Sequence, residues 1–172
     1  MRDARSPSDL TILAMGVGNT LLTDEAAGPR AVAMFETRHG DLPGVTFIDA
    51  GTLSFTLAEE IGAADALIIF DAARLGEAPG TVRLLEGQEM DDFVRTGKLT
   101  VHEVGITDLL DMARMTGDLP RYRALVAIEP LEIGWGLELS PPVAAAMERA
   151  AQTAFEVASR WIAQAQTEEI EA

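Results

Sequence analysis

Cysteine is absent from this chain of 172 residues. Its absence excludes disulfides, thiolate metal sites and cysteine nucleophiles, so any metal ion must be held by His, Asp, Glu or backbone oxygens. Long apolar runs are also lacking: none approaches the roughly 20 residues of a membrane span, and residues 1–10 lack the apolar core of a secretory signal. We therefore expect a cytoplasmic protein with no membrane partner.

Basic residues are few. The chain has 13 Lys and Arg against 28 Asp and Glu, which gives a net charge of −15, and Lys98 is its single lysine. Nucleic-acid binding needs clustered basic side chains that neutralise phosphates, so we expect no nucleic-acid partner. The charge favours a protein or peptide partner, although most of the acids can equally serve only to keep an exposed surface solvated.

The length and the apolar content of 48% predict one well-buried domain rather than two. We assign this domain to residues 10–166, between a flexible N-terminus at residues 1–9 and a flexible acidic tail at residues 167–172. We expect a monomer.

Short, continuous apolar runs alternate with helical stretches along the domain. Strands buried on both faces are predicted at residues 10–15, 45–48, 66–70 and 124–128, with a shorter edge strand at 82–85. Helices are predicted at residues 26–38, 53–61, 90–94 and 106–115, and a C-terminal helix is predicted to begin after Ser140 as its N-cap. This alternation predicts an α/β fold with a twisted, mainly parallel, five-stranded sheet and helices on both faces.

The first strand runs into a glycine turn that differs from a nucleotide-binding loop. Gly16-Val17-Gly18 is followed by Asn19, Thr20 and Leu21, so the third glycine of a dinucleotide fingerprint is missing. Asp24 and Glu25 follow at the expected helix entrance, where their charge suits the helix dipole but repels a phosphate. The turn therefore points toward a cation, unless these acids only cap the helix.

Three carboxylates lie where the first three strands end. Glu25 follows the first strand across its turn, Asp49 ends the second, and Asp71 ends the third. Ligands of open α/β sheets sit outside the carboxyl ends of the strands, so we expect these side chains at one rim. Each also has a purely structural reading: Glu25 as a first-turn acid, Asp49 in an Asx turn with Gly51, and Asp71 as a loop cap.

His102 is the fourth candidate, because it lies just before a helical pattern, where the helix dipole favours the neutral, metal-binding imidazole. His39, the other histidine, lies in a polar turn. Two carboxylates with one imidazole suit Zn, Ni, Mn or Fe without distinguishing them.

The chain has no HExxH or GxSxG motif and no supported Ser triad, so peptide hydrolysis here would need a water activated by a metal or by a carboxylate.

At these residues the chain resembles the hydrogenase maturation proteases, which trim the C-terminus of nickel-iron hydrogenase large subunits. The resemblance covers about residues 10–162. It is carried by five blocks in order: GVGNTLLTDEAAGPR from Gly16, DAGT from Asp49, the strand-end Asp71, HEVG from His102, and AIEPLEIGWGLELSP from Ala127. Ala50 departs from the glycine common in the second block.

The resemblance implies both a fold and a reaction. The fold is a mainly parallel sheet flanked by helices, and the reaction is removal of a short C-terminal peptide from the nickel-loaded large-subunit precursor. Glu25, Asp71 and His102 would contact nickel that the substrate presents, and Glu25, Asp49 and Asp71 are the candidate catalytic carboxylates. Glu129 would add a negative charge near the rim that tunes substrate choice.

Two other functions fit the same residues less fully. A non-catalytic, nickel-dependent binding module for the large subunit would use the same ligands without cutting the chain. A nucleotide-binding protein is disfavoured by Leu21 and by the acids that follow it.

Overall fold

The computed structural model describes residues 10–99 and 105–171. Their elements, in chain order, are β1 (Ile12–Val17), the 3₁₀ turn η1 (Thr23–Ala26), α1 (Ala27–His39), β2 (Val45–Gly51), α2 (Leu57–Ala63), β3 (Ala66–Ala72), β4 (Val82–Glu86), α3 (Gly87–Val94), α4 (Ile106–Thr116), β5 (Tyr122–Ile128) and α5 (Pro141–Glu171). In this part of the chain, no helix combines the length and the apolar character that crossing a bilayer requires.

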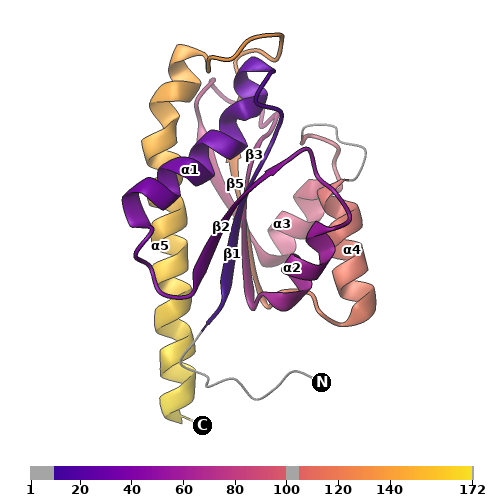
Figure 1. Ribbon diagram of the computed structural model, residues 1–172, viewed down its shortest axis with the longest axis vertical. Helices are drawn as coiled ribbons and strands as arrows, with labels where there is room; N and C mark the ends of the chain where they lie inside the picture. Colours follow the sequence, from indigo (N-terminus) through magenta and orange to yellow (C-terminus); the bar gives the residue numbers. More distant parts are fainter. Residues whose placement is uncertain (1–9, 100–104, 172) are drawn as a thin grey trace.

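The five strands form one sheet in the order β2-β1-β3-β5-β4. β2, β1, β3 and β5 pair in parallel, while β4 pairs with β5 in the antiparallel direction at the edge. This confirms the predicted α/β class and the mainly parallel five-stranded sheet. The parallel strands place their carboxyl ends at one edge, which lies at the top of Figure 1 together with the start of α1.

The two faces of the sheet carry separate hydrophobic cores. α1 and α5 cover one face, and α2, α3 and α4 cover the other (Figure 1). Successive strand residues alternate between them: Ile68 packs toward α1 and α5, whereas Leu67 and Ile69 belong to the core of the opposite face. Both sets are apolar because both faces are covered, so the strands read as continuous apolar runs in the sequence.

Several predicted bounds differ from the observed ones. The second helix begins at Leu57 instead of Leu53, because the Ser54 hydroxyl accepts hydrogen bonds from the Thr56 amide and hydroxyl in a turn. The third helix begins a turn earlier than predicted, at Gly87. α5 continues to Glu171, so residues 167–171, assigned from the sequence to a flexible tail, are helical.

The start of α1 lies unusually close to the sheet. A Cβ atom placed on Gly28 would lie 2.1 Å from the Val17 carbonyl oxygen and 2.5 Å from that of Phe70, while one on Gly16 would lie 2.3 Å from the Gly28 carbonyl oxygen. Only glycines permit this approach of backbone to backbone. The acids just before α1 are thereby held against the ends of β1 and β3.

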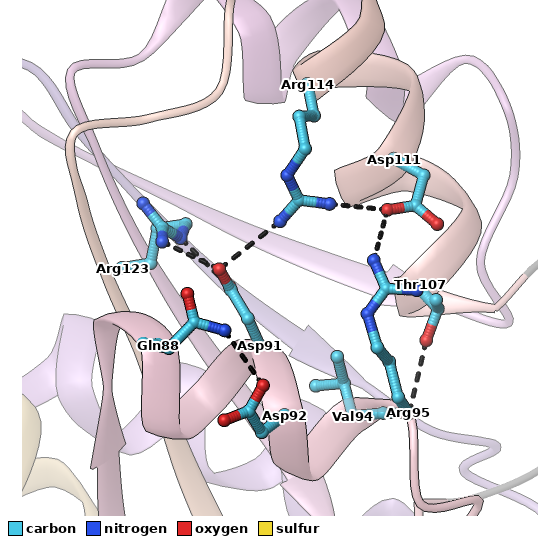
Figure 2. A network of polar contacts seen from close by, with 9 residues as sticks. All are labelled: Gln88, Asp91, Asp92, Val94, Arg95, Thr107, Asp111, Arg114 and Arg123. Atoms are coloured by element: carbon cyan, nitrogen blue, oxygen red, sulfur yellow. Dashed lines mark hydrogen bonds and ion pairs between the residues drawn. The ribbon is translucent and has the colours of Figure 1, made fainter.

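A polar network joins α3, α4 and β5 on the face of the sheet that α2, α3 and α4 cover (Figure 2). Asp91 is buried and accepts from Arg123 at both carboxylate oxygens, Nε to Oδ1 at 3.0 Å and Nη2 to Oδ2 at 2.8 Å. Arg114 also donates to Asp91, and Asp111 accepts from both Arg114 and Arg95 at 2.5 Å. The paired charges satisfy one another, which is the condition for burying them.

Replacing Gly28 with alanine tests the close approach of α1. We expect Gly28→Ala to lower the free energy of unfolding by about 1–3 kcal/mol, because the added methyl overlaps two backbone carbonyls that cannot move independently. Urea unfolding followed by circular dichroism measures the change. Gly134→Ala is the control, since a Cβ atom there meets nothing within 4 Å, and equal stability of the two variants would contradict the interpretation.

Candidate functional site

The site lies where the chain changes sides of the sheet. The connection from β1 to β2 passes through α1 on one face, and the connection from β2 to β3 passes through α2 on the other. This switch point lies between β1 and β3, which are adjacent. In open α/β sheets ligands bind in the crevice at such a point. Glu25 follows β1 and Asp71 belongs to β3, so both carboxylates lie at this crevice.

Glu25 is held in η1, between the end of β1 and the start of α1. Its amide donates to the Leu22 carbonyl at 2.8 Å, and its own carbonyl lies so close to Gly18 that a Cβ atom there would approach it to 1.8 Å. The residue is 7% exposed, and burial raises the pKa of its carboxyl. A raised pKa makes the carboxylate a stronger base and a ready partner for a cation.

Asp71 and Asp49 occupy very different environments. Asp71 is fully buried near the end of β3, in register with Ala127 of β5. Asp49 lies near the end of β2, in register with Gly16, and its side chain is exposed. Its Oδ1 accepts from the Gly51 amide at 2.9 Å, which is the Asx turn considered from the sequence. An exposed carboxylate at this edge remains accessible to water and to a bound peptide.

His102 lies outside the described residues. Within residues 10–99 and 105–171, no group of three or more His, Asp and Glu side chains is placed to hold a metal ion. Glu25, Asp49 and Asp71 therefore do not form a three-carboxylate metal site by themselves. The predicted trio of Glu25, Asp71 and His102, and the catalytic role of Asp49, stay predictions.

Asp24 has a role that the sequence did not indicate. It is fully buried, and its carboxylate accepts four hydrogen bonds: from the amides of Leu131 (2.8 Å), Glu132 (3.1 Å) and Ser140 (2.7 Å), and from the Ser140 hydroxyl (2.7 Å). Burial alone would raise its pKa, but the bonds from Ser140, Glu132 and Leu131 outweigh burial and lower it. Asp24 thus fixes residues 131–140 against the turn that carries Glu25.

Further contacts join the same two segments. The Thr23 amide donates to the Gly136 carbonyl at 2.9 Å, the Gly136 amide donates to the Leu21 carbonyl at 3.0 Å, and the Thr23 hydroxyl donates to the Glu132 carbonyl at 3.0 Å. Thr23 has a φ of 31°, a rare backbone conformation for a β-branched residue. The bonds to residues 132–136 hold this strained residue in place, directly before Asp24 and Glu25.

Glu129 does not act as a free rim charge, so that expectation is corrected. It is 7% exposed, and its Oε2 accepts from the amides of Leu75 at 2.5 Å and Glu77 at 3.3 Å. The carboxylate thus organises the loop after β3 by accepting from two of its amides.

Ser140 directly precedes α5 and its carbonyl accepts from the Ala144 amide, as predicted for the N-cap, and Pro141 and Pro142 begin the helix as predicted. The Ser140 hydroxyl, however, donates to Asp24. In the sequence, Asp24 stood out only together with Glu25, as one of two acids at the expected helix entrance. Its partners lie 107–116 residues away.

Comparison with known proteins identifies the family of this chain. The family model described as hydrogenase maturation protease matches residues 29–157. The hydrogenase expression/formation protein HupD of Bradyrhizobium diazoefficiens is 34% identical over 91% of this chain and 82% of its own length. The hydrogenase 2 maturation protease of Escherichia coli is 37% identical over 82% of this chain and 86% of its own length.

Solved structures of hydrogenase maturation proteases share the fold of this chain. The hydrogenase maturating endopeptidase HybD from E. coli superposes with a TM-score of 0.78 at 34% identity, covering 87% of this chain and 93% of HybD. The maturation protease HybD from Thermococcus kodakarensis reaches 0.72 at 26% identity, covering 86% and 99%. The fold and the matches define an α/β peptide hydrolase. The chain belongs to the hydrogenase maturation protease family, which confirms the resemblance found in the sequence.

Glu25→Gln tests the burial of the Glu25 charge. Because the folded-state pKa is raised, the wild type loses stability as the pH rises from the unfolded-state pKa, about 4.3, through the folded-state value. The uncharged variant escapes this loss, so we expect it to melt higher than wild type at pH 7.5, with the difference vanishing near pH 4. Each unit of pKa elevation corresponds to about 1.4 kcal/mol. Thermal melts across this pH range measure the effect. Glu89→Gln, at an exposed residue, is the control, and a Glu25→Gln protein less stable than wild type at pH 7.5 would refute the interpretation.

Asp24→Asn tests the anchoring of residues 131–140. An amide cannot accept four hydrogen bonds and brings its own N–H groups toward N–H donors, so we expect a loss of about 2–4 kcal/mol at pH 7. The lowered pKa of Asp24 stabilises the fold above its unfolded-state value of about 3.9, and this contribution disappears as the pH falls through the folded-state value. The difference between variant and wild type should therefore shrink in acid. Urea unfolding at pH 7 and pH 3 checks both points. The exposed Asp41→Asn is the control, and an Asp24→Asn protein as stable as wild type at pH 7 would rule out the anchor.

Proposed function

We propose that this protein is the endopeptidase that removes a short C-terminal peptide from the nickel-loaded precursor of a nickel-iron hydrogenase large subunit. Membership of the hydrogenase maturation protease family supports the reaction class. The observation that carries the proposal is the placement of two buried carboxylates, Glu25 and Asp71, at the switch point of the sheet.

Nickel enters this proposal as part of the substrate. A buried carboxylate is costly to ionise unless a cation or hydrogen bonds compensate its charge, so Glu25, whose pKa burial raises, suits a metal that arrives with the precursor. Asp71 would supply the second oxygen ligand from the end of β3. His102 would add the imidazole ligand that these two oxygen ligands lack. A precursor without nickel would leave the Glu25 charge uncompensated, so on this proposal it is not cut.

Asp49 is our candidate for the group that acts on water at the scissile peptide. It is the exposed member of the three carboxylates, and its Oδ1 is oriented by the Gly51 amide. A carboxylate so placed can take a proton from water as the water attacks the peptide carbonyl. Binding of the nickel to Glu25, Asp71 and His102 would hold that peptide in place, and such positioning lowers the barrier by several kcal/mol.

Cleavage of a purified precursor tests the proposal. Mixing the protein with nickel-loaded large-subunit precursor should release a short C-terminal peptide, seen as a mass loss by mass spectrometry, while nickel-free precursor stays intact. Glu25→Gln, Asp71→Asn and His102→Ala should each lower the cleavage rate by roughly 100-fold or more, with the fold retained by circular dichroism. Glu89→Gln, on the exposed surface of α3, is the control and should cleave normally.

Two results would decide against parts of this proposal. An unchanged precursor mass, with nickel-dependent binding retained, would favour the non-catalytic binding module instead. Full activity of all three variants would show that the site residues are wrongly assigned.

A further inference from the structure

The segment from Leu131 to Leu139 has an unusual pattern. Its sequence, LEIGWGLEL, places an apolar residue at every second position, and such alternation typically marks a strand that buries one face. Here it forms a loop with a single parallel bridge, between Gly136 and Leu22. Four of its five apolar side chains are exposed: 54% for Leu131, 39% for Ile133, 86% for Trp135 and 61% for Leu137. The fifth, Leu139, packs against the core that α1 and α5 cover.

Leu21, 52% exposed, joins these residues because its carbonyl accepts from the Gly136 amide. We call these five side chains the apolar rim patch. Most surface apolar residues occur singly and need no explanation, whereas a contiguous group marks an interaction site. The exposed tryptophan and leucine side chains of this patch therefore indicate a surface that another molecule covers.

The patch is built on a fixed backbone. Asp24 holds the Leu131 and Glu132 amides, and the Thr23 hydroxyl accepts from the Gly134 amide at 3.0 Å. Among the described residues, by contrast, no backbone hydrogen bond uses the amide or carbonyl of Ile133 or Trp135. A segment fixed in advance binds a partner with little further loss of conformational entropy. Its open backbone groups could pair with an extended chain.

The position of the patch indicates which partner it serves. Asp24 anchors the patch, and Glu25, the next residue, lies in the candidate site. A polypeptide that reaches Glu25 along this edge therefore passes the patch. The segment belongs to the carboxyl end of the sheet, and it crosses the top of the molecule between β5 and α5 (Figure 1).

The charged residues around the patch indicate what kind of segment it can bind. Glu132 and Glu138 are exposed between and beside the apolar residues, and residues 124–148 contain no Lys or Arg. Arg30 is the cation in contact with the segment, through a 3.4 Å hydrogen bond to the Leu137 carbonyl. An apolar surface flanked by carboxylates complements a segment that carries apolar side chains together with Lys or Arg.

We propose that the apolar rim patch is the docking surface for the polypeptide that leads to the scissile bond of the precursor, an apolar segment bearing Lys or Arg. The inference rests on the proposed function and deepens it, since it assigns substrate recognition to contacts that do not involve nickel. Binding through the patch therefore does not require metal loading, whereas cleavage requires both.

Trp135→Ala is the decisive variant, because a side chain 86% exposed contributes little to folding. We expect its KM for nickel-loaded precursor to rise at least tenfold, with kcat within twofold of wild type and an unchanged melting temperature. Its affinity for immobilised nickel-free precursor, measured by biolayer interferometry, should fall by the same factor. Met115→Ala is the matched control, since Met115 is 89% exposed at the end of α4, away from the carboxyl end of the sheet.

The flanking carboxylates are tested separately with Glu132→Gln/Glu138→Gln. This pair should weaken binding severalfold at low salt and reduce the salt dependence of KM, since fewer charges remain to be screened. Glu89→Gln/Glu156→Gln, exposed on α3 and α5, is the control pair and should bind as wild type does.

The outcomes separate this inference from the proposed function. Normal cleavage by wild type with unchanged KM and binding in Trp135→Ala overturns the docking surface and leaves the protease intact. No cleavage by wild type, with binding to nickel-free precursor that Trp135→Ala abolishes, overturns the protease and keeps the docking surface. Sedimentation showing that wild type self-associates and Trp135→Ala does not would assign the patch to a second copy of the chain, against the proposal.

Discussion

The candidate site depends on one buried carboxylate, that of Asp24. Its four hydrogen bonds join the turn after β1 to the segment that leads into α5, and they account for its lowered pKa. The turn carries Glu25, and the segment carries the apolar rim patch. Together with the contacts of Thr23, this charged group therefore sets the relative position of the proposed metal contact and of the proposed docking surface. Charged hydrogen bonds are the strongest that a protein offers for such a task.

Much of the fold could be predicted because local physics determined it. Strands covered on both faces are apolar along most of their length, and β1, β3 and the second half of β5 are buried runs of that kind. β2, predicted to be buried on both faces, is instead only partly buried because it lies at the edge of the sheet. Glu25 and Asp71 were predicted by a separate rule, because open α/β sheets bind ligands outside the carboxyl ends of their strands. Both acids lie there, although no observation yet tests their roles.

The rest was out of reach because it depends on contacts between distant residues. Asp24 and Glu25 look alike in the sequence. The Asp24 carboxylate, however, accepts hydrogen bonds from amides more than 100 residues away, whereas burial raises the pKa of the Glu25 carboxyl. Glu129 was expected to add a negative charge near the rim that tunes substrate choice, but it is buried and accepts from amides of the loop after β3. The second helix was predicted too early because the turn at Ser54 competes with the helix for the same backbone.

The exposed apolar rim patch has a consequence for the protein on its own. Tryptophan and leucine side chains in water favour association of one molecule with another, which is a hazard for any protein that waits for an infrequent partner. The net charge of −15 opposes this, since two approaching molecules repel each other before their apolar surfaces meet. Glu132 and Glu138 place part of that repulsion at the patch itself. If the patch is the proposed docking surface, the acidity that first seemed a general surface property would have a specific use, in keeping the patch free until a chain of complementary charge arrives.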